Sequence, residues 1–132
     1  MSTFKNLEEA VKYFEGDKYA MLSGMKLEEL SDDHAVSSVL LTEDHKNANG
    51  GIMGGAIFTL ADLSFAALAN NIHKPTVAQN VSINYLAAPK GKKLTAEAKI
   101  IRNGRTTCVL QINVKDDLGT DVALFTGTGY KL

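Results

Sequence analysis

The chain has 132 residues, which suits one domain, and its 45% apolar and 22% charged residues are typical of a globular protein. Its net charge of −1, from 14 basic and 15 acidic side chains, supplies neither the basic face that nucleic acid requires nor a polybasic membrane patch. With a single cysteine, Cys108, an internal disulfide is excluded and a reducing compartment is favoured, so we expect a cytoplasmic protein.

The first 42 residues are predicted to form one helix and two strands. Residues 3–15 are expected to be an N-terminal helix within residues 1–18, capped by Thr3, with an apolar stripe at Phe4, Leu7, Val11 and Phe14. The acidic character of this segment is unlike that of a signal peptide. Residues 19–30 and 33–42 are predicted as two strands joined by a polar turn, and residues 43–51 form a loop by composition.

A long apolar helix is predicted over residues 54–72, with Pro75 as the stop. The apolar run is short for a membrane span, begins with glycines and contains Asp62, so we expect a buried core helix and no membrane association.

The remainder has the character of β-structure. Strands are predicted at residues 76–88, 93–102, 106–116 and 120–132, arranged as a four-stranded antiparallel meander. An Asn-Gly pair within residues 102–105 is typical of a tight hairpin. A helix that is apolar nearly all round must be covered, so we expect one α+β domain, residues 1–132, in which a curved antiparallel sheet wraps the central helix.

Two features of residues 50–69 could carry chemistry. Gly54 and Gly55 open the long helix, where free backbone N–H groups could form an oxyanion hole; alternatively, the small residues allow tight packing. Asp62 lies two turns further on. It could be a base or nucleophile that faces a cleft, or it could be satisfied by local backbone or by a lysine.

Other residues give weaker signals. Asn47 could orient a water or a carbonyl, although an Asn before glycines is usually turn chemistry. The three histidines lack metal-ligand spacing, so no metal is expected, and Cys108 is predicted to be a core thiol. No dinucleotide or nucleoside triphosphate motif is present. The basic side chains near loops could form a solvated rim or meet ligand phosphates.

The segment NANGGIMGGAIFTLAD, residues 47–62, together with the strand-rich residues 81–132, resembles the hotdog-fold acyl-CoA thioesterases, most closely the phenylacetate-degradation (PaaI-like) type. The resemblance extends from about residue 20 to the end of the chain. It implies an acyl-CoA substrate with an aryl-acetyl or medium-chain acyl group. It also implies no cofactor, since coenzyme A is part of the substrate, and homodimers with an active site at the interface that assemble into homotetramers.

The resemblance also implies roles for individual residues. Asp62 would be the general base or nucleophile, the Gly54 amide would polarise the thioester carbonyl, and Asn47 would help to position water or the carbonyl. Residues expected to contact the acyl part of the substrate are Met53, Gly55, Phe58, Ser64 and Phe65, with Ile57 and strand residues near Tyr85 as further tunnel walls. Residues expected to contact coenzyme A are Asn103, Gly104, Arg105, Lys90 and Lys92.

Two positions depart from the family pattern. Met53 replaces a histidine that helps to orient the substrate carbonyl, and Ala78 replaces a serine or threonine near the attacking water. The departures leave open a non-catalytic acyl-CoA binding module. A hotdog hydratase or dehydratase is a further alternative, although it would need a histidine that this glycine loop lacks.

Overall fold

A computed structural model describes residues 2–132. Its helices are α1 (Leu7–Phe14), α2 (Lys18–Leu22), the 3-10 helix η1 (Glu43–His45) and α3 (Gly54–Ile72). Its strands are β1 (Lys26–Leu30), β2 (His34–Leu40), β3 (Thr76–Tyr85), β4 (Lys93–Asn103), β5 (Thr107–Asp116) and β6 (Asp121–Lys131).

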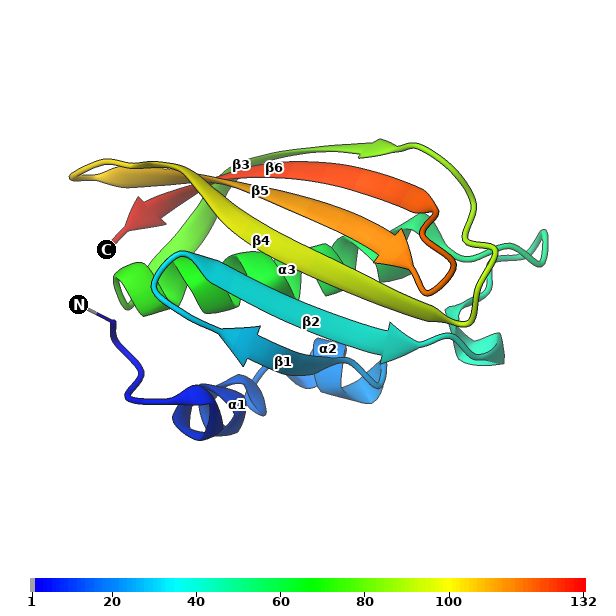
Figure 1. Cartoon of the computed structure of the whole chain (residues 1–132), viewed down its shortest axis with the longest axis horizontal. Coiled ribbons are helices and arrows are strands. Elements are labelled where there is room, and N and C mark those ends of the chain that lie inside the picture. Colours follow the sequence, from blue (N-terminus) through cyan, green and yellow to red (C-terminus); the bar gives the residue numbers. More distant parts are fainter. Residues whose placement is uncertain (1) are drawn as a thin grey trace.

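The six strands form one antiparallel sheet in the order β1-β2-β4-β5-β6-β3, which curves around α3 (Figure 1). Alternate residues of β4 and β5 point inward and are buried against the helix: Leu94, Ala96 and Ala98 on β4, and Cys108, Leu110, Ile112 and Val114 on β5. The intervening residues are half-buried or exposed, so the outer face of the sheet meets solvent.

The bounds of α3 agree with the predicted helix over residues 54–72. Most of its residues are buried, including Leu60, Ala61 and Leu68, each without exposed surface. The helix is long and apolar enough to cross a membrane by length and composition, but 61% of its apolar stretch is buried inside the fold. The sheet covers it, so it is a core helix.

The N-terminal region differs from the prediction in two ways. Helix α1 begins at Leu7, and its cap is Asn6 instead of Thr3: the Asn6 side chain accepts a hydrogen bond from the Glu9 N–H at 2.9 Å. The predicted strand at residues 19–30 divides into α2, a turn and β1. Gly24, with φ +78°, supplies the left-handed residue that follows a helix end, and this turn separates the two elements.

The predicted meander is also wrong at its first strand. Strand β3 pairs with β6, and β4 pairs with β2 and β5, so β3 lies at an edge of the sheet. Residues 86–92 connect β3 to β4 across the sheet, a longer route than a hairpin turn. Most side chains of β3 are exposed, as is usual for a strand at the edge of a sheet.

Both predicted hairpins exist, but the Asn-Gly pair does not form a two-residue turn. Asn103 is the last residue of β4, and residues 104–106 make the connection. Neither Asn103 nor Gly104 has the positive φ that a type I′ turn requires. Between β5 and β6, Gly119 has φ +83° and closes the second hairpin.

Candidate active site

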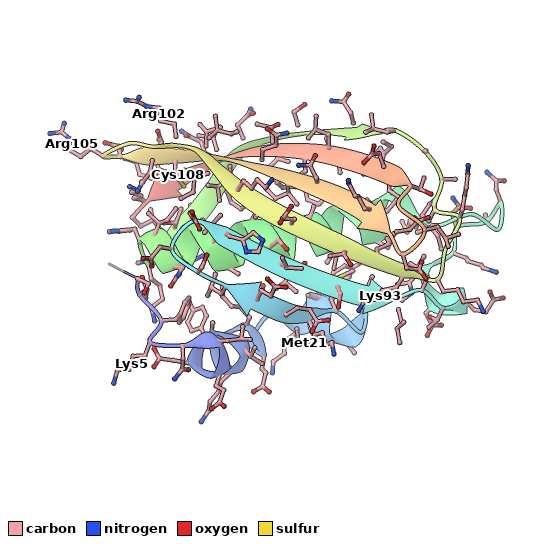
Figure 2. The ribbon with its side chains drawn as sticks, viewed as in Figure 1. Lys5, Met21, Lys93, Arg102, Arg105 and Cys108 are labelled. Atoms are coloured by element: carbon pink, nitrogen blue, oxygen red, sulfur yellow. The ribbon has the colours of Figure 1, made fainter. Side chains whose placement is uncertain are left out.

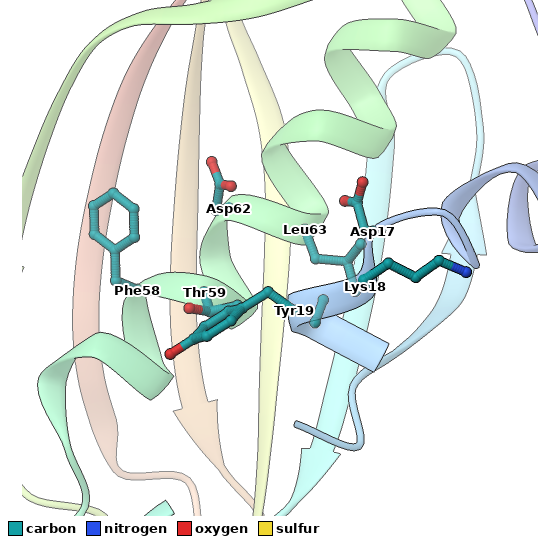
Figure 3. Close-up of a pocket in the computed structure, with 8 residues that line it drawn as sticks. Asp17, Lys18, Tyr19, Phe58, Thr59, Asp62 and Leu63 are labelled. Carbon is teal, nitrogen blue, oxygen red and sulfur yellow. The ribbon is translucent and has the colours of Figure 1, made fainter. Parts of the chain in front are cut away.

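A cavity of about 320 Å³ lies between α2 and the first half of α3. Figure 3 shows its walls, which combine carboxylates with aromatic and aliphatic side chains. The lining residues are Asp17, Lys18, Tyr19, Ala20, Phe58, Thr59, Asp62 and Leu63.

Asp62 is half-buried and points into this cavity from α3 (Figure 3). Its carboxylate makes no hydrogen bond or ion pair within residues 2–132, so neither local backbone nor a lysine satisfies it there. Burial, and secondarily the negative charge of Asp17, raise the pKa of Asp62. An unpartnered carboxylate with a raised pKa is a stronger base than an ordinary surface aspartate.

The start of α3 presents backbone donors. No acceptor within the described chain bonds the N–H groups of Gly54 and Gly55, as is usual for the first turn of a helix. The Tyr85 hydroxyl donates to the Gly54 carbonyl at 3.0 Å, and a Cβ placed on Gly54 would lie 3.1 Å from the Tyr85 ring. Glycine at position 54 therefore leaves room for the aromatic ring that closes over the helix start.

Gly54 and Asp62 are eight residues apart on one continuous helix. At 1.5 Å per residue this separates them by about 12 Å along the axis. A reacting carbonyl must lie about 3 Å from both its oxyanion donor and its attacking group. The two groups of one chain therefore cannot act on the same carbonyl.

The loop before α3 holds Asn47 and Met53. The Asn47 side-chain oxygen accepts the N–H groups of Asn49 at 2.9 Å and Gly51 at 3.1 Å, which shapes the turn that leads to the helix. Met53 occupies the N-cap position of α3 without a side-chain cap bond, and its side chain is 53% exposed next to Gly55.

The predicted acyl-contact residues divide between two faces of α3. Phe58 lines the cavity and packs against Phe125 at a ring-centroid distance of 5.2 Å. Ser64 has no exposed surface, and its hydroxyl bonds Ser37 at 2.6 Å and donates to the Ala96 carbonyl at 2.8 Å. Phe65 is likewise buried toward β6. The structure therefore does not bring Ser64 or Phe65 to the cavity, nor the buried Ile57.

The predicted coenzyme A contacts lie at opposite ends of the sheet. Asn103, Gly104 and Arg105 belong to the β4–β5 hairpin, while Lys90 and Lys92 precede β4 (Figure 2, where Arg105 and Lys93 mark the two ends). Lys131 donates to the Asn103 side chain at 2.6 Å and to the Gly104 carbonyl at 2.5 Å, which fixes the hairpin end.

Two aspartates hold the loop that carries Lys90 and Lys92. The Asp116 carboxylate accepts the N–H groups of Lys90 and Gly91 at 2.8 and 2.9 Å, and Asp117 accepts those of Lys92 and Lys93 at 2.8 and 3.2 Å. Burial opposes ionisation of Asp116, but the N–H donors outweigh it and hold its pKa well below the usual range.

The α2 side of the cavity could not be predicted from the sequence. Asp17 and Tyr19 line the cavity, but the sequence predicts Asp17 within the N-terminal segment 1–18 and Tyr19 at the start of a strand. A five-residue helix is too short to show a 3.6-residue period. The remaining signal was an aspartate immediately before Lys18–Leu22, a pattern typical of an N-cap.

Histidine and metal chemistry have no support in this cavity. His45 is buried, with Nε2 2.7 Å from the Ser23 carbonyl oxygen and Nδ1 accepting the Thr42 N–H at 2.9 Å. No histidine lines the cavity. Within residues 2–132, no group of three or more His, Cys, Asp or Glu side chains could hold a metal ion.

Comparison with known proteins identifies the family. Residues 49–123 match the model of the Thioesterase superfamily. An Archaeoglobus fulgidus protein named "Putative esterase" is 36% identical over 120 residues, which cover 90% of this chain and 78% of that protein. The acyl-coenzyme A thioesterase PaaI of Escherichia coli is 29% identical over 97% of this chain and 92% of its own length.

Solved structures of thioesterases have the same fold. The E. coli PaaI protein, from the phenylacetic acid degradation operon, superposes with a TM-score of 0.88 at 28% identity and covers 95% of this chain and 91% of that chain. A Streptococcus pneumoniae thioesterase solved with coenzyme A has a TM-score of 0.80 at 27% identity, covering 89% and 94%. The chain therefore belongs to the thioesterase superfamily, as a hotdog-fold enzyme of the PaaI-like type.

Proposed function

We propose that this protein hydrolyses acyl-CoA thioesters to the free acid and coenzyme A, with aryl-acetyl or medium-chain fatty acyl groups as substrates. The observation that carries the proposal is Asp62: an unpartnered carboxylate with a raised pKa that faces a cavity on the central helix of a thioesterase fold. The relatives support the substrate class, since one is named an acyl-coenzyme A thioesterase and another was solved with coenzyme A.

In the proposed reaction, Asp62 accepts a proton from a water molecule as the water oxygen attacks the thioester carbonyl carbon. Negative charge then develops on the carbonyl oxygen, where a Gly54 N–H donates to it. Collapse of the tetrahedral intermediate breaks the carbon–sulfur bond and releases the thiolate of coenzyme A. Direct attack by Asp62 to give a mixed anhydride, which water then hydrolyses, uses the same residues.

The proposed site is shared between two subunits. One helix cannot bring its own Gly54 and Asp62 to one carbonyl, so we assign the N–H donor to one subunit and the carboxylate to the other. Strand β3 supports this dimer, because it pairs only with β6 and leaves a ten-residue edge open within the described chain. Val77 and Tyr85 are exposed on this strand, and Val81 and Ile83 are half-buried.

Edge pairing would also unite the coenzyme A contacts. Two copies of β3 related by a two-fold axis run antiparallel, so opposite ends of the two sheets meet. The Asn103–Arg105 hairpin of one subunit then lies at the same end as Lys90 and Lys92 of its partner. We propose that these groups meet the phosphates of coenzyme A, with Asn47 and Met53 nearer the thioester. Tetramer formation, a cytoplasmic location and independence of a cofactor stay predictions.

The cavity supports the proposed acyl class. Phe58, Leu63 and Tyr19 give it apolar walls, and its volume of about 320 Å³ accommodates a phenyl ring or a chain of several methylenes. Ser64 and Phe65 are left out of the proposed site because they are buried away from the cavity.

Two alternatives to thioester hydrolysis are an acyl-CoA binding module and a hydratase. Met53, at the position of a family histidine, favours a module that binds acyl-CoA without turnover. Hydratase chemistry is disfavoured because both nitrogens of His45 are bonded and no histidine lines the cavity.

The test measures the release of the coenzyme A thiol from a panel of substrates. The panel contains phenylacetyl-CoA, benzoyl-CoA and straight-chain acyl-CoAs from two to sixteen carbons. We expect hydrolysis that peaks with aryl-acetyl or medium-chain substrates. Calorimetric binding of these esters without thiol release would support the binding module, and water addition to an enoyl-CoA would support the hydratase. Either result would contradict the proposal.

A further inference from the structure

A second carboxylate, Asp17, faces the cavity that contains Asp62 (Figure 3). Asp17 stands at the N-cap of α2, where an aspartate usually accepts a hydrogen bond from the first turn of the helix. Its side chain makes no such bond, although its own backbone N–H donates to the Phe14 carbonyl at 3.0 Å. The carboxylate is therefore not used to build the helix and is available to act in the cavity.

No ion pair offsets the charge of these two carboxylates within residues 2–132. The titratable side chains that line the cavity are Asp17, Lys18 and Tyr19 from the α2 segment and Asp62 from α3; none comes from the sheet. Lys18 extends away from Asp62 (Figure 3), and no ion pair joins it to either carboxylate within residues 2–132. Tyr19 is neutral near pH 7. Among the charged groups of the described chain, Asp17 raises the pKa of Asp62, and no lysine or arginine contributes an opposing shift.

We propose that Asp17 is a positioning residue for hydrolysis, whose negative charge keeps Asp62 basic enough to accept the proton of the attacking water. The inference rests on the proposed function, because it assigns a role within the same site. Asp17 acts through Asp62 and needs no contact with the reacting atoms.

The physical basis is the interaction of like charges across a partly desolvated space. Burial raises the pKa of Asp17 as well. Asp17 is nevertheless the more exposed of the two, and its negative charge opposes ionisation of Asp62. Together with burial, which is the larger cause, this charge raises the pKa of Asp62. A base with a pKa closer to the working pH takes a proton from water more readily once it is ionised.

The first test compares pH profiles of kcat for phenylacetyl-CoA hydrolysis by the wild type and Asp17→Asn. Activity rises with pH as Asp62 ionises, and we expect this acidic limb to move to lower pH in Asp17→Asn. The plateau rate should fall several-fold because the base is weaker. Asp17→Ser, which keeps a good N-cap residue, should behave in the same way, whereas Asp17→Glu should restore the wild-type limb.

Glu15→Gln is the matched control. It removes one negative charge from the same segment but from a side chain that does not line the cavity, so its acidic limb should coincide with that of the wild type. An acidic limb that stays in place in both neutral Asp17 variants would overturn the proposal. So would an equal movement in Glu15→Gln, because net charge alone would then explain the effect.

A second measurement separates this proposal from the proposed function. Carbon-13 NMR follows the carboxyl carbon of Asp62 during a pH titration, with no substrate present. A lower Asp62 midpoint in Asp17→Asn supports the coupling even if phenylacetyl-CoA is not hydrolysed; an unchanged midpoint refutes it. If Asp62→Asn retains full thioesterase activity, the proposed function of Asp62 fails, whatever the NMR titration shows.

Discussion

At the scale of single residues, the central helix holds two chemically different groups that its sequence separates by eight positions. Gly54 offers backbone donors at the helix start, and Asp62 offers a carboxylate in a cavity. Each group depends on its immediate surroundings. Tyr85 packs over Gly54, and within the described chain no hydrogen-bond donor or cation pairs with the Asp62 carboxylate. Their proposed roles can be tested one atom at a time.

The N–H of Gly54 can be removed without removing the helix. Proline is favoured at the first helical position, and Met53, with ψ 132°, already has the extended backbone that precedes proline. We expect Gly54→Pro to lower kcat for acyl-CoA hydrolysis by about 10²–10³-fold, the usual effect of losing an oxyanion donor.

Gly54→Ala is the control for this variant. It adds the Cβ that meets Tyr85 at 3.1 Å but keeps the N–H, so its kcat should fall much less. Equal losses of kcat in the two variants would mean that crowding against Tyr85, and not the N–H, explains the effect.

At the scale of secondary-structure elements, β6 can pack closely against the central helix because Gly127 has no side chain. A Cβ on Gly127 would lie 2.7 Å from the Phe65 ring, which is closer than real contacts allow. Because Phe65 is almost fully buried, it has little space in which to move. We expect Gly127→Ala to reduce the free energy of unfolding by about 1–3 kcal/mol, measured by urea denaturation.

Gly51→Ala is the matched control for Gly127→Ala. Its Cβ would meet nothing closer than 3.8 Å, and its φ is not positive, so its stability should be close to that of the wild type. An unchanged stability of Gly127→Ala would show that β6 can move away from α3.

The loop from β3 to β4 depends on Asp116. Because its pKa is lowered in the folded state, the carboxylate stabilises the fold at pH values above its unfolded pKa, and this contribution is lost as pH falls toward the folded pKa. Asp116→Asn should therefore melt several degrees below the wild type at pH 7, with a difference that shrinks in acid. Thermal unfolding between pH 7 and pH 2 measures this difference.

The control for the loop is Asp121→Asn, which removes an exposed carboxylate paired with Lys115 at 3.7 Å. It should change the melting temperature little, because exposed ion pairs contribute little to stability. A melting difference for Asp116→Asn that is as large at pH 2 as at pH 7 would contradict the assigned role of the carboxylate.

Elements with a strong sequence signal could be predicted, and those that depend on distant pairing could not. The apolar run 54–72, bounded by glycines and Pro75, gave the observed helix. The position of β3 beside β6 could not be predicted, because strand pairing across a long connection leaves no local pattern. At the site, Asp62 could be identified because it is a charge within an apolar run. Asp17 lies in an ordinary polar segment, so no pattern distinguished it. The sequence around Ser64 also did not indicate that this side chain faces the sheet.

At the scale of the whole molecule, the separation of Gly54 from Asp62 predicts a shared site. Subunits of Asp62→Asn and Gly54→Pro are each expected to be nearly inactive alone. After mixing and exchange, half of the dimers contain one of each, and one of their two sites combines an intact Gly54 with an intact Asp62. Activity should return to about a quarter of the wild-type value.

Sedimentation of the wild type should accompany this experiment, with a dimer or larger assembly as the expected species. If subunits exchange, as shown by differently labelled copies, and activity does not return, the two groups do not belong to one interfacial site. Recovery in a protein that sediments as a monomer would contradict the interface as well.

The most direct test of the account is the rate of thiol release by Asp62→Asn, with the acyl-CoA that the wild type hydrolyses best. The substitution keeps the size of the side chain and removes the base, so we predict that kcat falls by about 10²–10⁴-fold while binding of the substrate and the melting temperature are preserved. Thr59→Val, which alters another cavity residue without removing a carboxylate, serves as the control. A kcat for Asp62→Asn equal to that of the wild type would show that this carboxylate is not the catalytic group.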